Sequence, residues 1–277
     1  MRSTATQRST YAVGHSQQEF HGLSRQAQAY EPFTRQLFLQ AGIVPGMRVL
    51  DVGCGGGDVA FLVADLVGPG GEVIGTDRVA SAVQWAISRA QFRSMSNIRF
   101  LEGDPTEMSF DEPFDAVVGR LILMYYPDPV DAVRKLQCHL CPGGLTVFQE
   151  FDIANCRSLP PAPTFDRAAA LIRQTLLATG ARVQLGLELH QVYLDAGLPA
   201  PTMRMDSLVG GGPEFVGFAL VADVLHNLLP AIERLHLATA AELDLPTFEQ
   251  RLRQEVSANK AVILSPALIG AWSRKAS

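Results

Sequence analysis

The stretch Val49–Asp58, with the sequence VLDVGCGGGD, decides the fold. A short apolar run enters a glycine-rich turn, and a residue pattern typical of a helix follows from Asp58. This order predicts the opening of a doubly wound α/β sheet, in which ligands bind at the carboxyl ends of the strands. The turn requires positive φ angles and close backbone approach, which explains Gly53, Gly55 and Gly57. The amide groups that begin the next helix would face the ligand with the positive end of its dipole.

Two acids of this stretch bear on the ligand. A dinucleotide-binding turn has its third glycine at the sixth position, where this chain has Asp58, and Asp51 lies two residues before the first glycine. Two carboxylates favour a cation and repel a phosphate. The stretch resembles motif I of class I S-adenosylmethionine-dependent methyltransferases, an acid followed by Gly-x-Gly-x-Gly, and that cofactor is a sulfonium without phosphate. The alternatives are a structural turn in another α/β protein and an NAD-dependent dehydrogenase, which Asp58 disfavours.

Composition bounds the class of protein. The chain has 277 residues, 47% hydrophobic and 18% charged, which predicts a globular protein, either one large domain or a core with a substantial cap. The formal charge of −5 and the absence of a basic run argue against a nucleic-acid partner. No apolar run is long enough for a membrane span, and Met1–Thr10 is too polar for a signal peptide. We therefore expect a cytoplasmic protein with no membrane partner, as a monomer or homodimer.

The four cysteines include one C-x-x-C, at Cys138 and Cys141. A zinc site would need a second pair, but Cys54 and Cys156 are isolated, and a redox pair normally opens a helix instead of closing one. The sequence therefore predicts no metal site and two small buried residues at a helix end.

The rest of the chain predicts a seven-stranded, mostly parallel, Rossmann-like sheet with a helical cap, and the family resemblance implies that the last strand runs antiparallel. Two amphipathic helices, Ser16–Ala29 and Pro32–Ala41, precede the core. A turn at Pro142–Gly144 leads into the strand Leu145–Gln149, and the final strand is expected at Ala261–Trp272. The expected division is a helical leader or lid (1–44), a cofactor-binding core (45–156), a cap insertion (157–184), core (185–206), a helical cap (207–260) and the final strand (261–277).

A second acid supports the first motif. Asp77 closes the strand Glu72–Thr76 about twenty residues after the glycine turn, where a carboxylate can accept hydrogen bonds from both ribose hydroxyls. It could equally cap the helix that begins at Ala80. The family resemblance runs in order from Val49 to Glu150, and its closest likeness is to the small-molecule, quinone C-methyltransferase branch.

The resemblance implies further cofactor contacts. Asp104 matches the acid that accepts the adenine amine in this family, although Asp104-Pro105 is also a common turn. The full set of cofactor-binding residues that we expect is Asp51, Gly53, Gly55, Asp77, Arg78, Gly103, Asp104, Pro105, Gly119, Arg120 and Leu121.

The expected reaction is in-line displacement at the sulfonium methyl by an oxygen, nitrogen or carbon atom of a small acceptor. An apolar stripe in the cap is typical of a packed helix and, where it lines a pocket, indicates a compact apolar acceptor: Phe215, Phe218, Leu220, Val221, Val224, Leu225 and Leu228. Candidates for a general base are His15, Tyr125, Tyr126 and Glu150. A binding protein or non-methylating enzyme that retains the cofactor pocket is the alternative.

Overall fold

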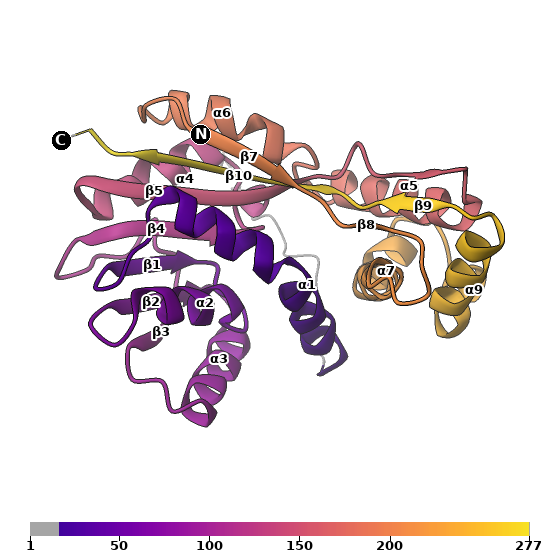
Figure 1. Ribbon diagram of the computed structural model, residues 1–277, viewed down its shortest axis with the longest axis horizontal. Helices are drawn as coiled ribbons and strands as arrows, with labels where there is room; N and C mark the ends of the chain where they lie inside the picture. The colour runs from indigo at the N-terminus through magenta and orange to yellow at the C-terminus, as the bar shows by residue number, and fades with distance from the viewer. Residues whose placement is uncertain (1–16, 277) are drawn as a thin grey trace, which may run out of the picture.

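The computed structural model describes residues 17–276, except for the side chains of residues 17–21 and 23. Its main sheet follows the order β3-β2-β1-β4-β5-β10-β7 (Figure 1). The strands of this sheet are β1 (Arg48–Val52), β2 (Glu72–Asp77), β3 (Ile98–Glu102), β4 (Phe114–Arg120), β5 (Leu140–Asp152), β7 (Thr202–Asp206) and β10 (Ala267–Arg274). The strands β1 to β5 pair in parallel, and β10 runs antiparallel to both β5 and β7. The predicted seven-stranded α/β sheet with its reversed last strand is confirmed.

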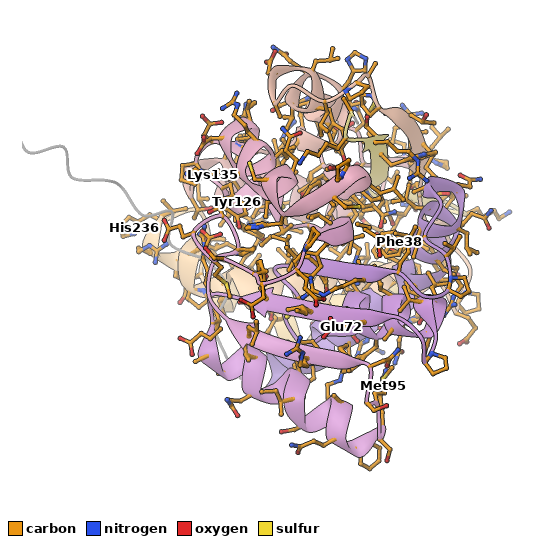
Figure 2. The ribbon with its side chains drawn as sticks, turned by 90° about the vertical axis from the view of Figure 1, so that its left-hand side faces the viewer. Phe38, Glu72, Met95, Tyr126, Lys135 and His236 are labelled. Atoms are coloured by element: carbon orange, nitrogen blue, oxygen red, sulfur yellow. The ribbon has the colours of Figure 1, made fainter. Side chains whose placement is uncertain are left out.

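Helices cover both faces of the sheet because its strands are apolar on both sides. Val49 packs with α1 (Gln17–Ala41), α2 (Asp58–Val67) and α3 (Ala80–Phe92). Its neighbour Leu50 packs on the other face with α4 (Pro129–Leu136) and α6 (Leu185–Asp195). Figure 2 shows Phe38 of α1 and Lys135 of α4 on opposite sides of the sheet.

The cap lies beyond the carboxyl edge of the parallel strands (Figure 1). It contains α5 (Pro163–Ala178), α7 (Gly217–Arg234), α8 (Ala240–Leu243) and α9 (Leu245–Ala258). A small antiparallel sheet in the order β6-β9-β8 joins them, with β6 at Arg157–Leu159, β8 at Val209–Gly210 and β9 at Val262–Leu264. No helix within residues 17–276 is long and apolar enough to cross a bilayer.

The final strand is divided, so the prediction of one strand over Ala261–Trp272 was wrong. Pro266 has no N–H to donate to a ladder, and the Ser265 N–H donates to the carbonyl of Leu208 at 3.0 Å. The chain therefore leaves the cap sheet as β9 and enters the main sheet as β10. One segment thus links the cap to the core.

The two predicted leader helices form one continuous helix, α1, with Pro32 inside it. Proline removes one helical hydrogen bond, which predicted the break. Tertiary packing overrides that local preference, because Tyr30 before the proline and Leu37 and Phe38 after it are all buried.

The Pro142–Gly144 segment is an irregularity within β5 and does not form a separate turn. The register with β4 shifts between the Phe114–Leu140 pair and the Ala116–Leu145 pair, so the extra residues bulge out of the ladder. Gly143 adopts a φ of 75° in this bulge. Cys138 is exposed on a short 3₁₀ turn and Cys141 is half-buried at the start of β5, so the prediction of two buried cysteines was wrong.

Tyr193 ties α6 to the sheet. Its buried hydroxyl accepts a hydrogen bond from the Phe148 N–H at 3.1 Å and donates to the Ala271 carbonyl at 2.8 Å. Tyr193→Phe leaves these two backbone groups without that partner, so we expect a loss of about 1–3 kcal/mol in the free energy of unfolding. Urea denaturation measures this loss, and an unchanged midpoint would show that the hydroxyl contributes nothing.

Candidate functional site

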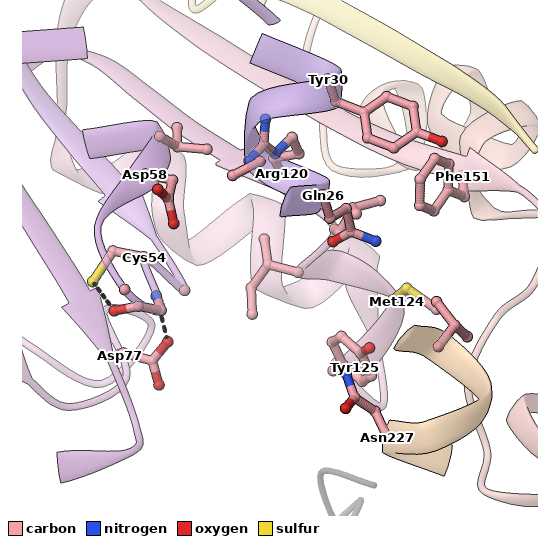
Figure 3. Close-up of a pocket in the computed structure, with 18 of the residues that line it drawn as sticks. Gln26, Tyr30, Cys54, Asp58, Asp77, Arg120, Met124, Tyr125, Phe151 and Asn227 are labelled. Carbon is pink, nitrogen blue, oxygen red and sulfur yellow. Dashed lines mark hydrogen bonds between the residues drawn. The ribbon is translucent and has the colours of Figure 1, made fainter. Parts of the chain in front are cut away.

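A cavity of about 360 Å³ opens at the carboxyl edge of the sheet, between core and cap. Its walls come from the turn after β1, the segments that follow β2, β3 and β4, and the helices α1, α5 and α7. In Figure 3, Cys54, Asp58 and Asp77 lie on one side of the cavity and Met124, Tyr125 and Asn227 on the other. The predicted site residues that line it are Gly53, Gly55, Asp77, Arg78, Gly103, Pro105, Arg120, Leu121, Tyr125 and Tyr126.

The glycine turn and Asp77 form one unit. Gly53, Gly55 and Gly57 have φ angles of 66°, 51° and 85°. One carboxylate oxygen of Asp77 accepts the Gly55 N–H at 2.9 Å, and the other accepts the Val79 N–H at 2.9 Å, just before α3. A carboxylate retains acceptor capacity beyond these two bonds, so Asp77 can fix the turn and still bind hydroxyl groups.

Gly55 borders open space, since a Cβ atom built on it would meet no heavy atom within 4 Å. In Gly55→Ala the methyl group would project into the cavity at a positive φ. We expect roughly tenfold or greater loss of affinity for S-adenosylhomocysteine, with about 1–2 kcal/mol of backbone strain. The matched control is Gly46→Ala, which has a φ of 88° and equally open surroundings but lies outside the cavity lining. Equal binding by both variants in calorimetry would contradict this placement.

Asp58 does not present an unbalanced charge. Arg89 donates to its two carboxylate oxygens at 2.6 and 3.1 Å, and the pair is largely shielded from solvent. The sequence argument that Asp58 repels a phosphate is therefore weakened, because Arg89, thirty-one residues away, neutralises it.

Asp51 lies beneath the cavity wall and does not line it. It is 1% exposed, and neither carboxylate oxygen has a hydrogen-bond partner among the described side chains and backbone groups. Burial raises the pKa of Asp51 to about 8, and the nearby Arg120 guanidinium opposes that rise.

Asp104 also lies outside the lining, between its neighbours Gly103 and Pro105, which are within it. Its carboxylate pairs with Arg78 and accepts hydrogen bonds from the Tyr126 hydroxyl at 2.9 Å and the Thr106 N–H at 3.0 Å. Burial alone would raise the pKa of Asp104, but these bonds hold it below its usual value. In this conformation the carboxylate joins the three segments that follow β2, β3 and β4.

Glu150 is fully buried and does not reach the cavity. Its Oε1 accepts the N–H groups of Ile122 and Leu123 at 2.9 and 2.7 Å, which holds the loop after β4. Burial raises the pKa of Glu150 to about 8, and these N–H groups limit the rise. We therefore assign Glu150 a positioning role.

Gly119 likewise faces the core, since a Cβ there would lie 2.7 Å from the Phe148 ring.

The remaining base candidates are tyrosines or lie outside the described residues. His15 belongs to the undescribed part of the chain. Tyr125 lines the cavity, and burial raises its pKa to about 12. Burial also raises the pKa of Tyr126. At neutral pH both hydroxyls keep their protons, so they can donate hydrogen bonds but are poor bases.

The cap side of the cavity is apolar. The Tyr30 and Phe151 rings meet edge to face at 5.3 Å. The α7 stripe divides into Phe218 and Leu225, which are buried in the core, and Leu220, Val221, Val224 and Leu228, which line the cavity. Sequence reasoning did not single out Gln26, Met124, Ile172 and Asn227, and only Asn227, as a polar residue within an apolar stripe, gave a local signal.

Comparison with known proteins defines the class. Residues 43–184, just over half of the chain, match the methyltransferase-domain family, and the chain belongs to that family. Its glycine turn and mostly parallel sheet are those of the class I, S-adenosylmethionine-dependent members. A demethylmenaquinone methyltransferase from Staphylococcus aureus is 31% identical over 143 residues, 51% of this chain and 56% of that protein. The chain thus spans about half the length of the curated relatives it matches.

Two solved structures share the fold. The YcgJ protein from Bacillus subtilis has a TM-score of 0.58 at 18% identity, over 88% of this chain and 99% of that one. The [4+2]-cyclase SpnF has a TM-score of 0.56 at 20% identity, over 90% of this chain and 82% of that one. At these identities the likeness concerns the fold alone.

Proposed function

We propose that this chain is an S-adenosylmethionine-dependent methyltransferase that acts on a compact, largely apolar small molecule. One observation carries the proposal: a single cavity joins the glycine turn and Asp77 to an apolar half formed by α5 and α7. The first half suits a nucleoside, and the second suits an acceptor without charge.

The residues present fit the cofactor. Gly55 leaves room against the backbone, Asp77 has spare acceptor capacity for ribose hydroxyls, and the orphaned oxygens of buried Asp51 suit a nearby ammonium group. When bound, S-adenosylmethionine supplies a methyl group made electrophilic by its sulfonium. Tyr30 of α1, together with Leu220 and the other cap residues that line the cavity, would exclude water and align the acceptor.

The acceptor would bind against the Tyr30–Phe151 pair, with Asn227 and Tyr125 as hydrogen-bonding groups. An aromatic acceptor with hydroxyl or carbonyl groups fits this wall best. The likeness to demethylmenaquinone methyltransferases supports a reduced quinone as the first acceptor to test, and the transfer would be O-, N- or C-methylation.

The test is methyl transfer from isotopically labelled S-adenosylmethionine to a panel of reduced 1,4-naphthoquinone, catechol and an aliphatic amine, read by mass spectrometry. We expect label on an aromatic acceptor and not on the amine. Binding of S-adenosylhomocysteine without transfer to any acceptor would favour the alternative, a protein that keeps the cofactor pocket for another purpose. Saturation by NADH, with no binding of S-adenosylhomocysteine, would reject the cofactor assignment.

We also propose a cytoplasmic location, a monomer or homodimer, and no nucleic-acid partner, as the sequence predicts. Cell fractionation, light scattering after size exclusion and a nucleic-acid binding assay test these three statements.

A further inference from the structure

Arg120 is a cation at the cavity wall that has no carboxylate partner among the described residues. It ends β4 and lies between the glycine turn and α1, with Asp58 to one side and Tyr30 to the other (Figure 3). Its guanidinium has five N–H donors, of which one donates to the Thr34 hydroxyl at 3.0 Å. No ion pair joins Arg120 to any of the side chains that the structure describes.

The acids around Arg120 are committed elsewhere. Asp58 pairs with Arg89 at 2.6 Å, and Glu31 pairs with Arg35 at 3.2 Å. The carboxyl oxygens of Asp51 have no hydrogen-bond partner among the described groups, and the raised pKa of Asp51 leaves this carboxyl mostly protonated at neutral pH in the ligand-free protein. Arg120 therefore retains a positive charge that nothing nearby balances fully.

The other arginine of the cavity differs in this respect. Arg78 also lines the wall, but Asp104 occupies its guanidinium. A half-buried guanidinium with unused donors is costly unless an anion completes it. Its planar fork matches a carboxylate, which it can bind through two parallel hydrogen bonds.

We propose that Arg120 binds the α-carboxylate of the cofactor's amino-acid end, and that Thr34 holds the guanidinium in place for it. This rests on the proposed function. A phosphate would satisfy the same donors, and Arg89 weakens the repulsion that Asp58 would exert on it. We favour the carboxylate because the family cofactor carries one and no phosphate.

This proposal makes the site selective for a cofactor with its amino-acid end intact. It also links cofactor binding to α1, because the Thr34 hydroxyl that receives Arg120 donates in turn to Gln149 Oε1 at 2.8 Å. Thr34 is therefore a positioning residue that joins α1 to β4 and β5.

The experiment is calorimetric titration with S-adenosylhomocysteine, with 5′-methylthioadenosine, which lacks the amino-acid end, and with NADH. The wild-type protein should bind S-adenosylhomocysteine about 100-fold more tightly than methylthioadenosine. Arg120→Met should lower the affinity for S-adenosylhomocysteine roughly 30- to 100-fold and change the affinity for methylthioadenosine by less than about threefold. The affinity of Arg120→Lys for S-adenosylhomocysteine should fall between those of the wild type and Arg120→Met, because lysine retains the charge but lacks the planar fork of the guanidinium.

Controls separate this role from a structural one. Thr34→Val should weaken S-adenosylhomocysteine binding by about three- to tenfold while leaving methylthioadenosine unaffected. Arg182→Met, an exposed arginine paired with Glu188 and outside the cavity lining, should bind as wild type. Circular dichroism and thermal melting establish that each variant is folded.

Four results would overturn the inference. Undiminished S-adenosylhomocysteine binding by Arg120→Met would remove Arg120 from the site. An equal fall for both nucleosides would give it a structural role. Wild-type protein that binds both nucleosides equally would show that the amino-acid end is not recognised, although the proposed function would survive. If wild type binds only NADH, the proposed function itself fails, and Arg120 is then a phosphate ligand.

Discussion

Asp77→Asn should lower the affinity for S-adenosylhomocysteine about 100-fold, the largest expected effect on binding of any single-atom change in this site. Asp77 already holds Gly55 and Val79 through its two oxygens. A ribose would add hydroxyl donors to the same carboxylate, and hydrogen bonds to a charged acceptor are worth about 1.5–3 kcal/mol each. The amide keeps one acceptor oxygen but turns the other position into a donor, which opposes both the Gly55 N–H and a hydroxyl.

The matched control for this change is Asp115→Asn. Asp115 is also half-buried and also accepts a backbone N–H, that of Arg48 at 2.8 Å, but it begins β4 at the opposite edge of the sheet. Calorimetry should show wild-type binding for Asp115→Asn. A loss of similar size in both variants would mean that Asp77 acts only through the stability of the fold.

Glu150→Ala should destabilise the fold by about 3 kcal/mol or more, since it leaves two N–H groups without their acceptor and creates a cavity. These N–H groups belong to Ile122 and Leu123, in the loop that carries Tyr125. Glu150→Gln retains the Oε1 acceptor and should remain folded. Thermal melting measures both, and a wild-type melting temperature for Glu150→Ala would exclude the proposed positioning role.

The pH dependence of stability gives a second test of Glu150. Its pKa rises from the ordinary value of 4.5 to about 8 in the folded protein, so the folded state binds more protons than the unfolded state between these values. Stability is therefore greatest below about pH 4.5 with respect to this group and falls as the pH rises toward 8. Buried Asp51 acts in the same direction.

We expect the wild-type melting temperature to fall between pH 5.5 and 8.5, and Glu150→Gln to show a shallower decline because the amide does not ionise. The comparison between the two proteins removes the contribution of Asp51, which both retain. An equally steep decline in the variant would contradict the raised pKa of Glu150.

Local sequence determined the core of this protein. The run from Val49 to Asp58 requires a strand, a turn with positive φ angles and a helix, and each of those features depends on residues within about ten positions. The prediction that Asp77 lies at the site followed from the length of one strand–helix–strand unit, which determines where the second strand ends. The apolar cap helices also follow from patterns that short segments carry by themselves, whereas the reversed direction of the last strand was implied by the family resemblance.

The tertiary structure determined which charged side chains pair with each other and which residues line the cavity. Arg89 neutralises Asp58, Asp104 pairs with Arg78, Glu150 turns into the core, and Tyr30 and Asn227 reach one cavity from helices about 200 residues apart. The same packing made α1 continuous through Pro32 and divided the last strand at Pro266. Periodicity and turn chemistry determine how a segment folds, but the partner of a side chain depends on which helices and strands meet in space, and that is settled by burial across the whole molecule.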